Sequence, residues 1–227
     1  MRAMILAAGR GERMRPLTDT LPKPLIPVAG KPLIQWHLEK LAAAGITNIV
    51  INHAWLGALI EDALGDGRQW GVSLQYSAEP VALETAGGIA TALPLLGTEP
   101  FLVINGDIWC DWDPAEARQI GEQLSRGSQQ AWLLLVPNPT HNAAGDFGLT
   151  ATGLLSQTGL PQHTFSGIGI YKPSLFANTP AHQAAKLAPL LREAISRQAV
   201  SGQLFKGIWI DVGTPERLST LECMLRS

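Results

Sequence analysis

The chain has little cysteine, little charge and no long apolar run. Its two cysteines, Cys110 and Cys223, lie far apart among 227 residues, so a disulfide framework or a cysteine-based zinc site has no support. The first eight residues are too short an apolar segment for a signal peptide, and no later run approaches the length of a membrane span. We therefore expect a cytoplasmic protein that does not bind membranes.

The charge balance gives no sign of a polyanionic partner. Seventeen lysines and arginines face 19 aspartates and glutamates, for a formal net charge of -2. This excess is too small and of the wrong sign for general attraction to nucleic acid, so a local cluster of cations is more informative. With 46% hydrophobic residues, the chain suits one α/β domain over 1–227 that buries about three quarters of its unfolded surface.

Short apolar segments alternate with amphipathic ones, as in a doubly wound, mostly parallel sheet with helices on both faces. The expected strands are 4–8, 46–52, 72–76 and 101–104, and the expected helices are 32–44, 55–64, 85–96 and 214–227. Ligands of such sheets lie beyond the carboxyl ends of the strands. Three loops are predicted to converge there: the one at Gly9, the one over 79–88, and 105–107.

The loop after the first strand has the composition of an anion site. Gly9 and Gly11 can adopt positive φ and turn backbone N–H groups toward a phosphate. Arginine forks can then bind non-bridging oxygens in a bidentate manner. The nearby cations are Arg10, Arg13, Arg15 and Lys23. A plain turn flanked by solvated basic residues is the alternative.

Two common phosphate loops do not fit this segment. A Walker A loop would need Gly-Lys-Ser/Thr after four intervening residues, and the Rossmann fingerprint would need glycine where Met14 stands. The loop must therefore bind phosphate in another way.

The N-terminal motif resembles the signature of sugar-phosphate nucleotidyltransferases. It reads Leu6-Ala7-Ala8-Gly9-x-Gly11-x-Arg13-Met14-x-Pro16-Leu17-Thr18, followed by Pro22-Lys23-Pro24 and Gly30-Lys31-Pro32. The resemblance implies a Rossmann-like nucleotide-diphospho-sugar transferase fold with a small antiparallel sugar-binding part. It also implies a nucleotide-binding half over about 1–115, a sugar-binding half over about 116–227, and Mg²⁺ as cofactor. The reaction would join a nucleoside triphosphate to a sugar 1-phosphate and release pyrophosphate.

The same resemblance assigns roles to individual residues. Arg13 would contact the triphosphate and Lys23 the α-phosphate and sugar phosphate, so the catalytic set is Lys23, Arg13 and Asp107. Arg15 and Arg10 match the pattern less well. The expected nucleotide-binding residues are Ala7, Ala8, Gly9, Gly11, Glu12, Arg13, Lys23, Glu79, Thr85 and Gly87.

Two aspartates are expected to hold the metal. Asp107 follows an apolar strand and a glycine, which by itself is typical of a turn, but Asn105-Gly106-Asp107 resembles the metal-binding element of the family. Asp211 ends the apolar run 208–210 and resembles the second metal-binding segment. Water and phosphate oxygens would complete the octahedron of Mg²⁺. Without metal, Lys23 is expected to relieve the repulsion between the two carboxylates.

The segment 79–88 should bind the base. Its Leu83-x-Thr85-Ala86-Gly87 resembles the family's Leu-Gly-Thr-Ala-Gly, with Glu84 where the family has glycine. Because glutamate adopts positive φ less readily than glycine, either the loop has another shape or Glu84 caps the helix that follows.

Sugar selection is expected in the second half, with Asn105, Gly148 and Ser166 as sugar contacts. The Glu-Lys-Pro tripeptide of many relatives is absent between Thr152 and Ser166, which suits a bulkier sugar or a mobile lid. Together with the short chain and the segments 83–88 and 105–109, this resembles N-acetylmuramate 1-phosphate uridylyltransferases. It implies UTP, a cell-wall amino sugar carrying a lactyl ether, and recycling of cell-wall precursors.

Other interpretations stay open. Mannose 1-phosphate guanylyltransferase is the second candidate, and a catalytically silent nucleotide-sugar sensor is the third. No β-helix repeat follows Asp211, and a monomer or a small homo-oligomer is expected. The five histidines lack zinc-site spacing and are interpreted as structural, and Trp109 and Trp112 as core residues.

Overall fold

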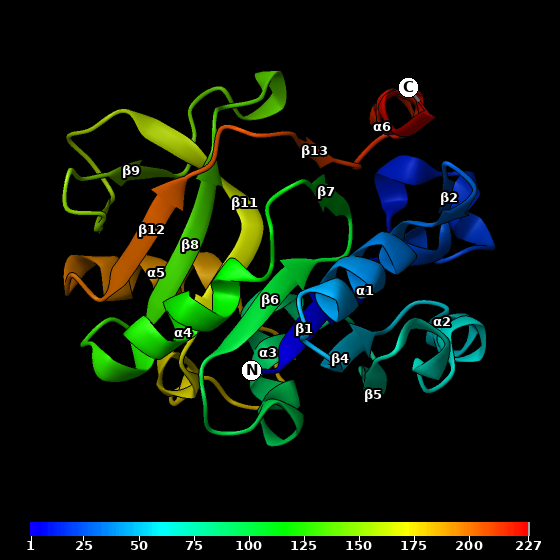
Figure 1. Ribbon diagram of the computed structural model, residues 1–227, viewed down its shortest axis with the longest axis horizontal. Coiled ribbons are helices and arrows are strands. Elements are labelled where there is room, and N and C mark those ends of the chain that lie inside the picture. The colour runs from blue at the N-terminus through cyan, green and yellow to red at the C-terminus, as the bar shows by residue number, and fades with distance from the viewer. Residues whose placement is uncertain (227) are drawn as a thin grey trace.

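The first half of the chain is built on four parallel strands. The computed structural model describes residues 1–226 and places these strands side by side in the order β5, β4, β1 and β6 (Figure 1). Their bounds are β1 Ala3–Leu6, β4 Asn48–His53, β5 Ser73–Ala78 and β6 Phe101–Asn105. All four were predicted from apolar segments, with ends that differ by at most two residues.

The second half continues the same sheet. Strand β11 runs antiparallel to β6 and β8, and β12 lies parallel to β8 at the far edge. Two short strands, β9 and β10, extend β11 as the small antiparallel part that the family resemblance implied. The bounds are β8 Ala131–Val136, β9 Phe147–Leu149, β10 Leu155–Ser156, β11 Gln162–Tyr171 and β12 Val200–Leu204.

Helices cover both faces of the sheet, which confirms the doubly wound α/β class. Helices α1, α2 and α4 pack on one face, and α3 and α5 on the other (Figure 1). Each face has its own buried core because alternate strand residues point to opposite sides. The helix bounds are α1 Leu33–Ala43, α2 Gly57–Leu64, α3 Glu84–Leu96, α4 Glu116–Arg126, α5 Leu187–Ser196 and α6 Pro215–Arg226.

The four predicted helix starts differ from the observed ones by one or two residues. Pro32 lies at the N-cap of α1, one residue before the first helical position that was expected for it. Helix α2 begins at Gly57 because Leu56 takes a left-handed conformation, with φ of 53°, that cannot continue into a regular helix. None of the helices within residues 1–226 is long and apolar enough to cross a membrane.

Short 3₁₀ helices occupy the connections. The glycine loop after β1 contains two of them and a third carries Lys23. The 3₁₀ helices are Glu12–Met14, Leu17–Asp19, Lys23–Leu25, Arg68–Trp70, Thr140–Asn142 and Pro173–Phe176.

Two small ribbons join the C-terminal helix to the sheet. Strands β2 (Pro27–Val28) and β3 (Lys31–Pro32) form a hairpin, and α6 packs beside β2 (Figure 1). Strand β13 (Trp209–Asp211) pairs antiparallel with β7 (Ile108–Cys110). Trp109 and Trp112 are 9% and 2% exposed, so their interpretation as core residues is confirmed.

The order of the strands fixes where a ligand can bind. The chain passes from β1 to β4 on one side of the sheet and later places β6 on the other side of β1, so the strand order reverses between β1 and β6. Gly106 lies at this point and donates its N–H to the Leu6 carbonyl over 2.8 Å. A Cβ on Gly106 would lie 2.6 Å from the same oxygen, so only glycine allows this approach. Asp107 comes next.

Candidate active site

The glycine loop bends through Gly11. Gly11 has φ of 68°, and its carbonyl accepts a hydrogen bond from Thr18 Oγ1 at 2.8 Å. A Cβ at this position would lie 2.9 Å from Thr18 Cγ2. Gly9 does not adopt positive φ, so the expectation for it was wrong, and a Cβ there would meet nothing within 4 Å. Gly11 therefore shapes the loop, whereas Gly9 keeps the space above it open.

A cavity of about 520 Å³ lies between this loop and the end of β6. It brings together most of the residues predicted to bind nucleotide and adds Met14, Pro24 and Gly213. Its lining consists of Leu6, Ala7, Gly9, Arg10, Gly11, Glu12, Arg13, Met14, Lys23, Pro24, Thr85, Asn105, Gly106, Asp107 and Gly213. Ala8 lines a neighbouring cavity of about 340 Å³ together with Gly9 and Thr85.

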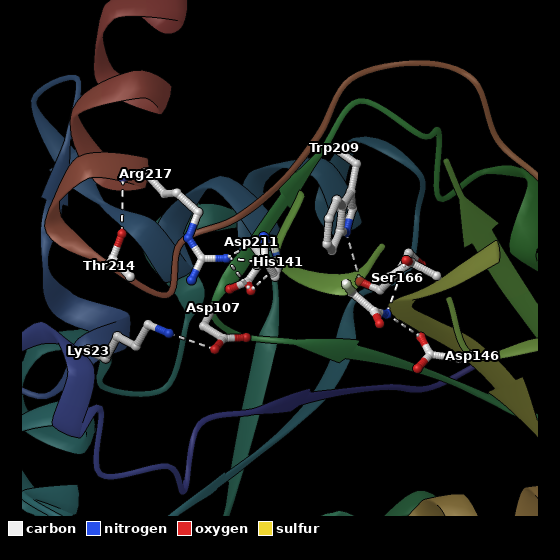
Figure 2. Close-up of polar contacts among 11 residues, drawn as sticks. Lys23, Asp107, His141, Asp146, Ser166, Trp209, Asp211, Thr214 and Arg217 are labelled. Carbon is white, nitrogen blue, oxygen red and sulfur yellow. Dashed lines mark hydrogen bonds and ion pairs between the residues drawn. The ribbon is translucent and has the colours of Figure 1, made fainter. Parts of the chain in front are cut away.

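Lys23 and Asp107 form an ion pair at the wall of the larger cavity. Lys23 Nζ lies 2.6 Å from Asp107 Oδ2, and the lysine side chain is only 9% exposed (Figure 2). Pro22 enters the 3₁₀ helix Lys23–Leu25 in an extended conformation and directs the lysine inward. The expectation that Lys23 neutralises one of the two aspartates is thus confirmed, and its ammonium group is held in place beside the cavity.

Strand pairing brings Asp211 next to Asp107. Asp211 stands opposite Ile108 in the ladder of β13 and β7, and Val212 donates its N–H to the Asp107 carbonyl over 2.8 Å. Both carboxylates line a cavity of about 300 Å³ that adjoins the larger one. Two residues separated by more than one hundred positions therefore lie at one site, as the family resemblance implied.

Asp211 is neutralised by an arginine that the sequence did not identify, and a histidine lies beside it. Arg217 Nη1 donates to Asp211 Oδ2 over 2.8 Å, and His141 Nε2 lies 3.3 Å from the same oxygen (Figure 2). The guanidinium also contacts the His141 ring at 3.0 Å. His141 was interpreted as structural, and that interpretation does not hold, since its ring lines the cavity of Asp211.

The donor chemistry of this site suits a hard divalent cation. Two carboxylates from adjacent strands supply the oxygen ligands that Mg²⁺ prefers. Within residues 1–226, no three His, Cys, Asp or Glu side chains gather closely enough to hold a metal by themselves. A bound ion would therefore have to complete its coordination with water or substrate oxygens.

The arginines of the loop separate into two groups. Arg13 lies by the Asp211 cluster, since a Cβ on Gly213 would be 3.0 Å from its Nη2 and 2.4 Å from Nη2 of Arg217. Arg10 stacks on Trp55 at 4.4 Å and still lines the cavity. Arg15 instead pairs with Asp19 at the surface over 3.2 Å, so its expected role beside Arg13 has no geometric support.

Glu79 and Gly87 support the predicted base loop through buried contacts. Glu79 is 4% exposed and accepts hydrogen bonds from Asn52 Nδ2 at 2.7 Å and from Leu83 N at 2.8 Å. Gly87 is packed against backbone, because a Cβ there would lie 2.1 Å from the Gln183 carbonyl. Thr85, by contrast, lines both cavities.

Glu84 keeps the backbone conformation of a glycine. Its φ is 58°, and it is the first residue of α3. The N-cap of that helix is Leu83, without a side-chain cap. Glu84 therefore makes no side-chain cap, but its charge stands in the first turn of α3, as expected for an acidic residue at a helix start.

The expected sugar contacts are only partly brought together. Asn105 and Ser166 line the cavity of Asp211, with the Ser166 carbonyl accepting from Trp209 Nε1 at 2.8 Å. Gly148 lies in β9, where a Cβ would be 2.9 Å from Leu160 Cβ, and it does not line that cavity.

The family model of nucleotidyl transferases matches residues 2–226. The chain belongs to this family. It is 56% identical over 227 residues to an N-acetylmuramate alpha-1-phosphate uridylyltransferase of Neisseria meningitidis serogroup B, covering 99% of this chain and 98% of that protein. An enzyme of the same name from Caulobacter vibrioides is 35% identical, covering 98% and 96%. A mannose-1-phosphate guanylyltransferase catalytic subunit beta of Danio rerio is 28% identical, covering 99% and 64%.

Solved structures show the same fold as this nucleotidyl transferase. A Bacillus anthracis protein assigned as a glucose-1-phosphate thymidylyltransferase, in complex with sucrose, superposes with a TM-score of 0.87 at 23% identity, covering 100% and 96% of the chains. An apo UDP-glucose pyrophosphorylase superposes with a TM-score of 0.78 at 20% identity, covering 100% and 98%.

Several polar residues of the site in this nucleotidyl transferase escaped sequence reasoning. They come from the loop before β9 and from β11 and β13: His141, Asn142, Asp146, Thr164 and Trp209. Asp146 accepts hydrogen bonds from Asn142 at 3.1 Å and from the Phe165 backbone at 2.8 Å (Figure 2). The only sequence signal was the density of polar side chains between Thr140 and Asp146, which also suits an exposed loop.

Proposed function

We propose that this chain joins UTP to N-acetylmuramate α-1-phosphate, giving the UDP-sugar and pyrophosphate. The observation that carries the reaction is the Lys23–Asp107 ion pair at 2.6 Å, set between the glycine loop and Asp211. The choice of substrates is supported by the 56% identical relative, which bears that name. The first half would bind the nucleotide and the second half the sugar.

The chemistry follows from the charges. A phosphate oxygen of the sugar 1-phosphate attacks the α-phosphorus in line, a new P–O bond forms, and the bond to the β-phosphate breaks to release pyrophosphate. The nucleophile is already an anion, so no general base is required. Two unit charges of like sign at 4 Å repel by about 4 kcal/mol at an effective dielectric of 20. Catalysis must therefore depend mainly on fixed cations that offset this repulsion.

Lys23 and Arg13 would supply those cations. Lys23 is buried and already oriented by Asp107, so little reorganisation is needed when a phosphate arrives. Arg13 is exposed at the junction of the two cavities, where its fork can bind the triphosphate. Ala8, Gly9 and Gly11 would provide the backbone of the nucleotide site.

Asp107 and Asp211 would hold Mg²⁺, which neutralises phosphate charge when it is bound. Each carboxylate is paired with a cation of the protein in the structure, Lys23 or Arg217. We expect those cations to turn toward phosphate oxygens when the carboxylates are otherwise engaged. The two free cysteines and a nucleotide substrate support a cytoplasmic location.

The test is release of pyrophosphate by the purified protein. N-acetylmuramate 1-phosphate and mannose 1-phosphate are each offered with UTP, GTP, CTP and dTTP in the presence of Mg²⁺. Highest kcat/KM for UTP with N-acetylmuramate 1-phosphate supports the proposal. A preference for GTP with mannose 1-phosphate would instead identify the protein as a mannose-1-phosphate guanylyltransferase. Nucleotide binding without any turnover would indicate a catalytically silent sensor.

A further inference from the structure

Glu84 occupies a backbone conformation that favours glycine, beside the proposed nucleotide site. Its φ of 58° is costly for a residue with a Cβ. The residue lines the cavity of about 340 Å³ that also contains Ala8, Gly9 and Thr85. A residue with a strained backbone therefore places a carboxylate at the wall of this cavity.

Contacts on both sides of Glu84 hold this conformation in place. The Leu83 N–H donates to Glu79 Oε2 over 2.8 Å, and the Leu83 carbonyl accepts from Ala185 N at 3.0 Å. Ala86 donates its N–H to the Ala185 carbonyl over 2.9 Å. Glu79 is itself bonded to Asn52, whose Oδ1 accepts from Ala7 N at 3.0 Å. The backbone of Glu84 is therefore fixed to the ends of β1 and β4.

The carboxylate itself is available to a ligand. Glu84 is exposed, and among the described residues its side chain takes part in no ion pair or hydrogen bond. The N–H groups of Glu84 and Thr85 stand in the first turn of α3, where an α-helix offers them no partner. The next two N–H groups, those of Ala86 and Gly87, are already bonded to Ala185. The cavity is thus lined by one strong acceptor that has no partner among the described residues.

An acceptor of this kind suits the N3–H of uracil. Uracil presents a ring N3–H between two carbonyl oxygens, whereas cytosine presents an unprotonated N3 and an amino group. A carboxylate accepts from N3–H but repels the lone pair of the cytosine N3. A site built to accept from one N–H rejects strongly the analogue that lacks it.

We propose that Glu84 is the residue that selects UTP over CTP, by accepting a hydrogen bond from N3–H of the base. The proposal rests on the proposed function, since it places the base in the cavity next to the glycine loop. The competing role for Glu84 is a negative charge that stabilises the start of α3 without touching the base.

The experiment compares UTP and CTP for the wild type and two variants. Glu84→Gly removes the carboxylate and suits the positive φ, and Glu84→Gln keeps size and backbone while removing the charge. We expect Glu84→Gly to lower the ratio of kcat/KM for UTP over CTP by about 10- to 100-fold. Glu84→Gln should lower it less, mainly by improving CTP, because the amide can donate to the cytosine N3.

The matched control is Gln198→Gly. Gln198 is another exposed residue with positive φ, 56°, in the turn between α5 and β12. Both glycine variants should fold with a Tm no lower than that of the wild type, and only Glu84→Gly should change the nucleotide ratio. An unchanged ratio in both Glu84 variants, or an equal loss for UTP and CTP, overturns the proposal.

Calorimetric binding of UTP and CTP with Mg²⁺, without sugar phosphate, separates this proposal from the proposed function. A wild type that binds UTP but forms no product would overturn the proposed function, while the binding ratio still tests Glu84. If Glu84→Gly does not fold, the Glu84→Gln ratio decides.

Discussion

Arg217 in the first turn of α6 donates to the carboxylate of Asp211, the last residue of β13, over 2.8 Å. Both side chains are about one fifth exposed, so solvent screens the pair only in part. The C-terminal helix thereby supplies a counter-charge to an aspartate that we expect to bind metal. The free protein avoids an uncompensated pair of carboxylates because Lys23 does the same for Asp107.

Removing Arg217 should strengthen metal binding to the nucleotide-free protein. In Arg217→Met the cation no longer competes for Asp211, and we expect affinity for Mn²⁺ to rise on the order of tenfold. Electron paramagnetic resonance titration of free Mn²⁺ measures it. Arg226→Met is the control, since Arg226 pairs with Glu222 farther along α6. Equal or weaker Mn²⁺ binding in Arg217→Met would contradict competition for Asp211.

Lys23→Ala should reduce turnover. Loss of one oriented donor to the transition state lowers kcat on the order of 10²- to 10³-fold. Steady-state assays of pyrophosphate release give kcat and KM separately. Lys31→Ala is the control, because Lys31 is a partly exposed lysine that pairs with Glu39 and stacks on Trp36 outside the cavity. A raised KM with unchanged kcat would show that Lys23 contributes only to binding.

Gly11→Ala and Gly9→Ala should separate stability from ligand binding. Gly11 has φ of 68° and no room for a Cβ, so alanine there should cost about 1–3 kcal/mol of unfolding free energy. Gly9 lacks both constraints, so its alanine variant should unfold like the wild type but bind UTP more weakly. Urea unfolding and calorimetry test the pair. Equal unfolding free energies of the two variants would show that the positive φ and close packing of Gly11 do not make alanine destabilising there.

Buried His37 should make stability fall in mild acid. Burial, followed by the nearby Lys40 charge, lowers the His37 pKa from 6.5 to about 4. The unfolded chain then binds a proton below pH 6.5 that the folded protein does not bind until about pH 4. Stability is therefore complete above pH 6.5 and declines toward pH 4, by roughly 3 kcal/mol in total.

Urea unfolding of the wild type and His37→Leu between pH 4.5 and 7.5 tests this dependence. Other groups titrate in the same range, so the difference between the two proteins is the quantity of interest. His37 Nε2 is buried without a partner among the described residues, and leucine removes that polar atom. We expect the variant to lose less stability as pH falls, and parallel curves would speak against His37.

The parts of the site that depend on residues close together along the chain could be predicted from the local sequence. The glycine loop, the strand end at Asp107 and the placement of Lys23 after Pro22 were all predicted, because turn geometry and strand periodicity act over a few residues. The doubly wound, mostly parallel class of the sheet followed from the alternation of strands and helices, whereas the order of the strands came from the structure. Asp211 was identified because its segment resembles the second metal-binding element of the family, and it also ends an apolar strand.

Contacts between distant segments were decided only in three dimensions. Arg217 and His141 are separated by 76 positions, and no periodic pattern relates them. They meet because β13 pairs with β7 and because the loop before β9 folds over the same sheet end. The conformation of Glu84 shows the same principle, since its own propensity opposes a positive φ. It is held there by the hydrogen bond that Leu83 donates to Glu79 and by backbone hydrogen bonds of Leu83 and Ala86 with Ala185, about one hundred positions away.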